Sequence, residues 1–126
     1  VIKECGLKNI VAVHGRAEDF GQDKKYRESF DIATARAVAN LATLTELCTP
    51  FIKVGGSFVC MKGDATEEIK NAEKAIKELG MKKEKIDTFK LVGNDADRTI
   101  IIYKKEKSTP NKYPRKAGVP SRNPII

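Results

Sequence analysis

The spacing of apolar residues predicts three strands before residue 62. Residues 9–14 (NIVAVH) form a short apolar run rich in β-branched side chains, which predicts a strand buried on both faces of a sheet. A second strand is predicted within residues 26–34 and centred on 30–33 (FDIA), and a third over residues 57–61 (SFVCM). Short, continuously apolar runs of this kind are typical of parallel sheets.

Two other stretches have the three- and four-residue spacing of an amphipathic helix. We expect the first to be closed by Gly55 and Gly56, with Pro50 disturbing its final turn. The second begins where Asp64 and Glu67 resemble a capping box, and it ends at Gly80. The apolar positions are Val38, Leu41, Leu44, Leu47, Cys48, Phe51 and Ile52 in the first helix and Ile69, Ala72, Ile76 and Leu79 in the second.

The last part of the pattern alternates with a period of two. Residues 86–92 and 98–103 flank a turn at 93–97, which predicts an antiparallel hairpin. The whole order is strand, loop, strand, helix, strand, helix and hairpin. It is typical of an α/β domain with a mainly parallel sheet and an antiparallel edge.

Ligands of such sheets bind beyond the carboxyl ends of the strands, so the loops that follow the predicted strands are candidate sites. The three loops contain one cation each, Arg16, Arg36 and Lys62. Like charges gathered at one rim repel one another. We therefore expect these residues to bind an anionic ligand.

Composition narrows the classes of protein to consider. The 126 residues, 40% hydrophobic and 33% charged, fit one globular domain, and no apolar stretch is long enough to span a bilayer. Cys5, Cys48 and Cys60 are odd in number and lack CxxC spacing, which argues against disulfides or zinc and indicates the reducing cytoplasm. His14 is the only histidine and no GxSxG is present, so a multi-histidine metal site is excluded and a hydrolase triad is disfavoured. We expect Cys48 and Cys60 in the core and His14 in a structural role.

The net charge of +7 is concentrated at the C-terminal end. Residues 104–126 carry seven basic side chains and one acidic one, whereas the preceding residues are nearly neutral. Prolines at 110, 114, 120 and 124 exclude a helix or a central strand there. We expect a domain over residues 1–107 and a basic, proline-rich tail over 108–126, which either solubilises the protein or binds phosphates. A second basic cluster, Lys82, Lys83 and Lys85, is expected to be a solvated surface.

Residues 1–6 (VIKECG) end like a helix but lack an N-cap, so we expect the C-terminal piece of a larger protein. Neither GxGxxG nor GxxxxGK[ST] is present, and a phosphate-binding turn is expected upstream of Val1. An incomplete sheet has a free edge, and we expect such an edge to favour self-association.

Four ordered motifs stand out: 14–20 (HGRAEDF), 30–39 (FDIATARAVA), 61–63 (MKG) and 112–120 (KYPRKAGVP). Together they closely resemble the GidB (RsmG) family, bacterial guanine-N7 methyltransferases of small-subunit ribosomal RNA that use S-adenosylmethionine. The resemblance implies part of a class I S-adenosylmethionine-dependent methyltransferase sheet, Rossmann-like, with the C-terminal antiparallel hairpin. It also implies 16S ribosomal RNA or the small ribosomal particle as the partner, a cytoplasmic location and no membrane.

The resemblance assigns roles to individual residues. Ala17 and Glu18 match a pair that contacts the adenosine of the cofactor, and Arg36 matches an arginine of cofactor binding. Arg16 and Lys62 match basic positions that matter for methylation, as catalytic and RNA-contacting residues. The tail implies further RNA contacts, by Lys112, Tyr113, Arg115 and Lys116. The family's glycine-rich turn and ribose-binding acidic residue precede this sequence, so the chain alone is expected to be impaired in cofactor binding.

Guanine N7 carries a free lone pair, so its methylation needs alignment rather than a general base. An arginine forked onto O6 and N7 would block the nucleophile. We therefore expect Lys62 or Arg16 to donate to O6 or to flanking phosphates, and Arg36 to orient the cofactor. Tyr113 either stacks on an unpaired base or pins the tail to the domain. Two alternatives remain: a non-catalytic RNA-binding module, and an α/β enzyme for another nucleotide-like cofactor.

Overall fold

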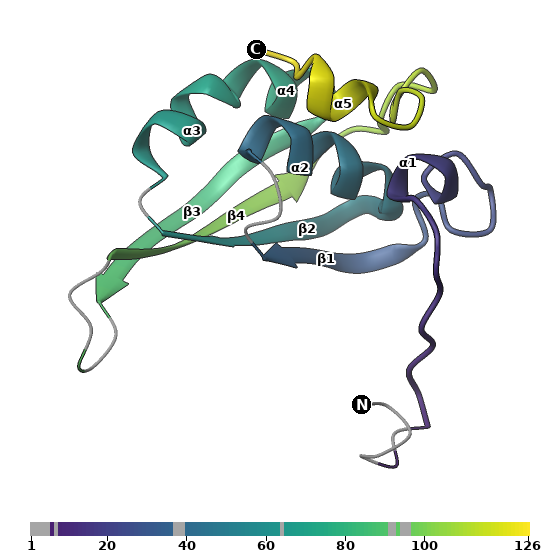
Figure 1. The fold of residues 1–126 in the computed structure, drawn as a ribbon, viewed down its shortest axis with the longest axis horizontal. Coiled ribbons are helices and arrows are strands. Elements are labelled where there is room, and N and C mark those ends of the chain that lie inside the picture. The colour runs from purple at the N-terminus through teal and green to yellow at the C-terminus, as the bar shows by residue number, and fades with distance from the viewer. Residues whose placement is uncertain (1–5, 7, 37–39, 64, 91–92, 94–96) are drawn as a thin grey trace.

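The computed structural model describes residues 6, 8–36, 40–63, 65–90, 93 and 97–126. A layer of helices covers one face of a four-stranded sheet (Figure 1). The strands are β1 (Phe30–Arg36), β2 (Ile52–Lys62), β3 (Met81–Lys90) and β4 (Asp97–Lys105). The helices are α1 (Ala17–Phe20), α2 (Leu41–Cys48), the 3-10 turn η1 (Thr49–Phe51), α3 (Thr66–Asn71), α4 (Glu73–Glu78) and α5 (Val119–Arg122).

The strand order in the sheet is β1-β2-β4-β3. β1 and β2 are parallel with α2 between them in the chain, whereas β4 runs antiparallel to both β2 and β3. The predicted α/β class and its C-terminal hairpin are therefore confirmed. The expectation of a mainly parallel sheet is wrong for the described strands, because residues 9–14 add no parallel strand and two of the three strand pairs are antiparallel. Arg36 pairs in register with Met61, so the carboxyl ends of β1 and β2 lie side by side.

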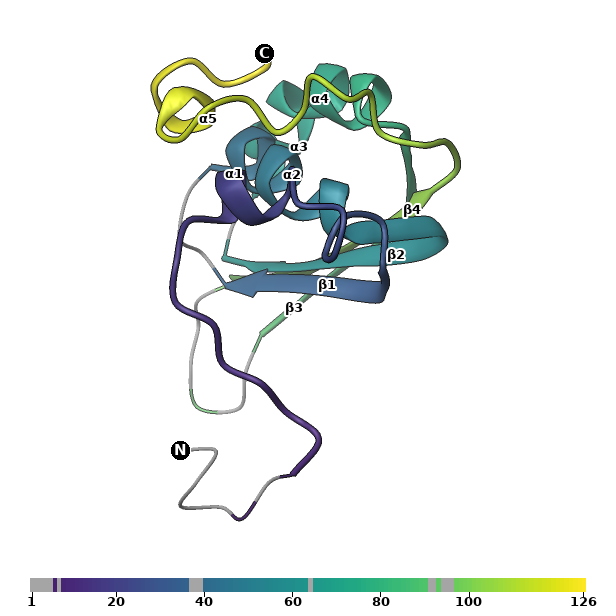
Figure 2. The ribbon, with the colours of Figure 1, turned by 90° about the vertical axis from the view of Figure 1, so that its right-hand side faces the viewer.

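The predicted strand over residues 9–14 is wrong. This segment extends away from the sheet (Figure 2) and exposes its apolar side chains, Val11 at 85%. A strand buried on both faces needs hydrogen-bonded neighbours, and none of the described strands pairs with this segment.

The first predicted helix ends earlier than its glycines indicated. α2 ends at Cys48 and β2 begins at Ile52, so Gly55 and Gly56 lie inside a strand. A Cβ on Gly56 would overlap the carbonyl oxygen of Asp31 in β1. The β1–β2 register also shifts beside these glycines, which therefore permit an irregular strand approach instead of closing a helix.

The second predicted helix forms as two short helices, α3 and α4, divided at Ala72. Ala72, Ile76 and Leu79 are buried as predicted. Gly80 follows α4 with φ +85°, a conformation that glycine adopts without strain. The predicted cap Asp64 lies outside the described residues.

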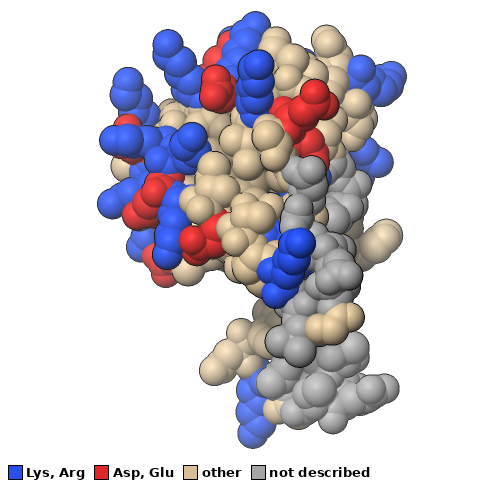
Figure 3. All heavy atoms as spheres, turned by 90° about the vertical axis from the view of Figure 1, so that its left-hand side faces the viewer, with Lys and Arg blue, Asp and Glu red and all other residues tan. Residues whose placement is uncertain are grey.

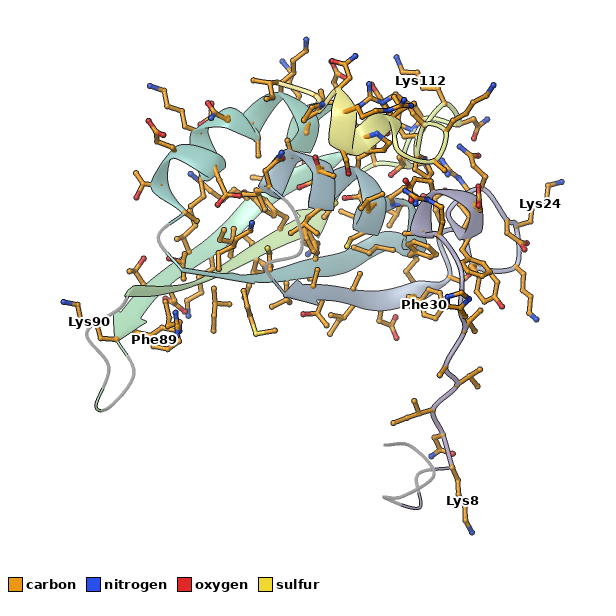
Figure 4. All side chains as sticks on the ribbon, in the orientation of Figure 1. Lys8, Lys24, Phe30, Phe89, Lys90 and Lys112 are labelled. Carbon is orange, nitrogen blue, oxygen red and sulfur yellow. The ribbon has the colours of Figure 1, made fainter. Side chains whose placement is uncertain are left out.

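The core lies between the helices and one face of the sheet, and it includes Leu41, Leu44, Phe58, Ile76, Leu79, Ile101 and Tyr103. On the opposite face the described residues leave apolar side chains open to solvent, including Ile32 at 63% and Phe89 at 41% (Figure 4). None of the helices in the described ranges is both long and apolar enough to cross a membrane.

The proline-rich segment 108–126 lies on the helical layer (Figure 2). Thr109, Tyr113 and Ile125 are buried within it. The expectation that its prolines exclude a helix is wrong for the single turn α5. Pro120 lies in the first turn of α5, where a missing N–H leaves no intrahelical bond unmade.

Candidate functional site

The first cluster of predicted site residues lies where β1 and β2 end. The Lys62 side chain is 8% exposed, and its Nζ lies 2.8 Å from Oε1 of Glu68 in α3. The same oxygen accepts a hydrogen bond of 3.0 Å from the backbone N–H of Leu41, the first residue of α2. A carboxylate is favoured at a helix N-terminus by the helix dipole, so Glu68 is well placed to orient the Lys62 ammonium. The backbone of Arg36 ends the neighbouring strand, and its side chain lies outside the described part of the structure.

The second cluster surrounds α1. Arg16 precedes α1, is 59% exposed, and lies 3.0 Å from Oε2 of Glu18. The Glu18 side chain is 6% exposed and also accepts a hydrogen bond of 2.8 Å from the backbone N–H of Gly118 in the tail. Burial raises the pKa of this carboxyl, but the N–H groups of Gly118 and Glu18 and the Arg16 guanidinium outweigh burial, so the pKa lies below its usual value.

We expect acid to weaken this link between α1 and the tail. Because the folded-state pKa of Glu18 lies below the unfolded value of 4.5, its stabilisation is complete above that pH and is lost as the pH falls through the folded pKa. In urea unfolding, Glu18→Gln should therefore have a lower free energy of unfolding than the wild-type chain at pH 7, and this difference should be smaller at pH 3. Asp19→Asn, a change at an exposed neighbour, is the control. A deficit equal at both pH values would contradict the role of the Glu18 charge.

Two tail residues that the resemblance linked to RNA are bound to the domain itself. Glu46 in α2 is fully buried and accepts hydrogen bonds from Arg115 at its backbone N (2.8 Å), Nε (3.0 Å) and Nη2 (2.7 Å). The Tyr113 hydroxyl donates to Oε2 of Glu78 at 2.7 Å, and Tyr113 is 5% exposed. In this conformation Tyr113 pins the tail to the domain, one of its two predicted roles.

The structure divides the three predicted rim cations. Arg16 lies with Glu18 and the tail, near a hollow of about 360 Å³ lined by Glu18, Asp19, Gln22, Asn111, Lys112, Pro114, Arg115 and Lys116. Lys62 and the backbone of Arg36 lie at the ends of β1 and β2, beside the first turn of α2. The predicted convergence of all three is therefore wrong, because residues 9–14 form no strand that could carry Arg16 to that rim.

Ala17 lines a larger pocket of about 690 Å³. Its walls are mainly aliphatic and aromatic, and they include Val11, Val13, Phe20, Phe30 and Phe51. An apolar pocket of this size is suited to a planar heterocycle such as adenine. Of the predicted cofactor residues, Ala17 thus lies at an apolar pocket, whereas the carboxylate of Glu18 is bonded to Arg16 and Gly118.

The two described cysteines do not have reactive thiols. Burial raises the pKa of Cys48 to about 12 and that of Cys60 to about 11, so both remain protonated at neutral pH. Cys60 is fully buried, as predicted, and Cys48 is partly buried against the core. His14 is exposed in the segment before α1.

Two lysines of the β3 cluster pair with acidic side chains. Basic and acidic side chains are likewise interspersed over the face drawn in Figure 3. Lys82 pairs with Glu106 at 3.8 Å and Lys85 with Asp87 at 3.3 Å. Exposed pairs of this kind contribute little to stability, and they leave a solvated surface, as predicted.

Lys105 is a buried cation, although in the sequence it stands out only as part of a basic run. Its side chain is fully buried, and Nζ donates to the carbonyl oxygens of Thr49 (3.0 Å) and Ile52 (2.7 Å). Oε2 of Glu28 lies 3.0 Å away. Burial lowers the pKa of Lys105 despite this carboxylate. The alternation of side chains along β4 was the one sequence signal for this burial, because it places Lys105 on the same face as Ile101 and Tyr103.

Comparison with known sequences gives consistent results. The family model GidB, rRNA small subunit methyltransferase G, matches residues 1–101. The chain is 54% identical over 127 residues to the ribosomal RNA small subunit methyltransferase G of Brevibacillus brevis, covering 100% of the chain and 53% of that protein. It is 53% identical over 125 residues to the protein of that name from Acetivibrio thermocellus, covering 99% and 52% respectively. The chain therefore spans about half the length of the curated relatives it matches.

Among solved structures, the chain resembles the 16S rRNA methyltransferase RsmC of T. thermophilus, in complex with AdoMet and guanosine. The TM-score is 0.52 at 13% sequence identity, covering 86% of this chain and 27% of that one. At this identity the likeness concerns the fold alone, and it agrees with a class I methyltransferase sheet.

Proposed function

Because this chain belongs to the GidB family, rRNA small subunit methyltransferase G, we propose that it takes part in S-adenosylmethionine-dependent methylation of guanine N7 in 16S ribosomal RNA in the cytoplasm. The observation that carries the proposal is the side-by-side placement of Arg36 and Lys62 at the carboxyl ends of two parallel strands. In α/β sheets this edge is where ligands bind.

The residues at this edge have to align the reactants. The cofactor supplies an electrophilic methyl group, and guanine N7 supplies its own lone pair, so no proton has to be removed. Correct orientation of two reactants contributes up to about 7–11 kcal/mol in well-aligned systems. Lys62 suits this task because Glu68 holds its ammonium at the edge of the sheet where ligands bind. We assign Lys62 to guanine O6, where it leaves N7 free to react.

The other predicted residues take supporting roles in the proposal. Arg16 is 59% exposed and suits a contact with flanking phosphates, as do the exposed Lys112 and Lys116. The apolar pocket beside Ala17 suits the adenine of the cofactor, and Arg36 orients the cofactor. The half-buried Arg115 and the buried Tyr113 fix the tail in position.

Methyl transfer provides the test. A chimera of the Brevibacillus brevis relative, with its matching half replaced by this chain, should transfer labelled methyl groups to 16S rRNA at N7 of a guanine. A folded chimera that binds 16S rRNA and S-adenosylhomocysteine but does not methylate the RNA would contradict the proposal.

In this chimera Arg36 and Lys62 are expected to have separable effects. Arg36→Ala should weaken S-adenosylhomocysteine binding about tenfold, the cost of losing a charged hydrogen bond. Lys62→Ala should leave that affinity unchanged and lower the turnover number at least tenfold, because the contact acts on the RNA base. Calorimetry and single-turnover methylation measure the two effects. Lys83→Ala, an exposed lysine of β3, is the control, and equal loss of cofactor affinity in both variants would contradict this division.

One observation favours a non-catalytic RNA-binding module as the second candidate. The carboxylate of Glu18, which the resemblance assigns to adenosine, is bonded to Arg16 and Gly118. In that case the chain would bind RNA with a steep salt dependence, and neither it nor the chimera would bind S-adenosylhomocysteine. The names of the curated relatives give no support to an enzyme for another nucleotide-like cofactor.

A further inference from the structure

Arg27 lies in the loop between α1 and β1, and its guanidinium binds four backbone carbonyl oxygens, three of them far away in the sequence. Nη1 donates to Gly21 at 2.9 Å and to Tyr113 at 2.6 Å. Nη2 donates to Thr109 and to Pro110, both at 3.0 Å. Three of these four acceptors belong to the tail, so one side chain fixes the path of the tail where it leaves β4.

Gln22, five residues earlier, completes this clasp. Its Nε2 donates to the carbonyl oxygens of Asn111 at 3.1 Å and Pro114 at 2.8 Å. Arg27 and Gln22 together bind five carbonyl oxygens of residues 109–114. Residues 109–114, which we call the clasped turn, are thus fixed along their length by side chains of another loop.

The clasp fixes the backbone on both sides of Lys112 and leads into Arg115, which Glu46 holds next to Lys116. The Lys112 side chain is exposed at the surface of the clasped turn (Figure 4), and its Nζ lies 5.2 Å from the ring centre of the buried Tyr113. Lys116 is exposed beyond the turn and lines the same hollow as Lys112. Glu18 and Asp19 line that hollow too, so a phosphate bound by the two lysines has to lie away from these carboxylates.

We propose that Arg27 is a positioning residue for RNA binding, which holds residues 109–114 so that Lys112 and Lys116 form a preordered pair of phosphate contacts. The inference deepens the proposed function and rests on its assignment of these lysines to RNA. Ordering a flexible segment costs conformational entropy at every residue, and the clasp meets that cost during folding instead of during RNA binding. Lysine cannot replace Arg27, because only the planar guanidinium directs several donors at carbonyls on two sides.

The test measures RNA affinity of the 126-residue chain as a function of salt, using a fluorescein-labelled RNA hairpin and fluorescence anisotropy. Arg27→Lys preserves the net charge but removes the fork. We expect affinity to fall about fivefold at low salt. The slope of log K against log salt should become shallower by about one to two, because each phosphate contact contributes roughly 0.7–0.9. A purely structural role would lower the folded fraction without changing this slope.

Three further variants control the measurement. Arg98→Lys is an equally conservative change in β4, outside the clasp, and should leave affinity and slope unchanged. Gln22→Ala should give a smaller loss than Arg27→Lys, and it keeps the test decisive if Arg27→Lys does not fold. The pair Lys112→Ala and Lys116→Ala should weaken binding by the wild-type chain and add little in the Arg27→Lys background.

The outcomes separate the two proposals. A wild-type chain with no affinity for the hairpin overturns the assignment of Lys112 and Lys116 to RNA, and with it the inference. A wild-type chain that binds RNA, with wild-type affinity and slope in the folded clasp variants, overturns the role of Arg27 alone.

Discussion

Replacing Lys105 with methionine is expected to destabilise the protein by about 3–4 kcal/mol, toward the lower end of the cost of breaking a buried ion pair at one partner, because the Glu28 side chain that remains is 28% exposed. Methionine fills a similar volume, so the loss arises from polar groups and not from a cavity. The change leaves the Glu28 carboxylate and the carbonyl oxygens of Thr49 and Ile52 without their shared donor. Glu28 also has φ +48°, a strained conformation for a residue other than glycine, and the ion pair helps to hold it.

Urea unfolding at neutral pH measures this effect. Lys104→Met changes an exposed residue of the same strand and should shift the free energy of unfolding by less than about 0.5 kcal/mol. Adding Glu28→Gln to Lys105→Met should recover part of the loss, because the unpaired carboxylate is then neutral. A Lys105→Met protein as stable as the Lys104→Met protein would show that the buried cation contributes nothing.

Removing the Glu46 carboxylate is expected to cost about 3 kcal/mol and to release the tail from α2. Glu46 is fully buried, whereas the Arg115 side chain retains 26% exposure and can be partly rehydrated, which places the cost at the lower end of the range for buried pairs. Glu46→Ala also removes the acceptor of the Arg115 backbone N–H. The backbone of the tail should then become accessible to trypsin at Lys112 and Lys116.

Urea unfolding and limited trypsin digestion test this prediction together. Glu46→Gln keeps an acceptor oxygen and should lose less stability than Glu46→Ala. The double variant Glu46→Ala with Arg115→Ala should cost less than the sum of the two single changes, because no unpaired charge remains. Cleavage of the tail at the wild-type rate in Glu46→Ala would contradict the anchoring role.

In the RNA-binding role proposed for the basic tail, these anchors change how the tail would act. A mobile cationic arm binds phosphates through charge alone, whereas here Glu46, Glu78, Arg27 and Gln22 fix its backbone and leave Lys112 and Lys116 exposed. A fixed pair of cations recognises a particular spacing of phosphates. The tail is therefore suited to orient a structured RNA in addition to attracting it.

The apolar pattern of the sequence determined the strands at 30–33 and 57–61, the helix at Leu41 and the C-terminal hairpin, because each element buries one face against a core that its own spacing reveals. The four motifs likewise determined the family, and the matched family model supports it. The adjacent ends of β1 and β2 followed from the predicted parallel order. Local spacing was sufficient wherever the partner of an element lay next to it in the chain.

Only the tertiary structure decided the remaining features. The run at 9–14 has the composition of a buried strand, but a strand forms only where a neighbour pairs with its backbone, and sequence spacing does not report that neighbour. Arg27 and Arg115 look like ordinary surface cations in sequence, yet Arg27 binds tail carbonyls 82–86 residues away and Arg115 binds Glu46, 69 residues away. Side-chain hydrogen bonds over such separations leave no periodic signal. The clasp, the buried Lys105 and the division of the cations into two clusters therefore arise from the packing of distant segments.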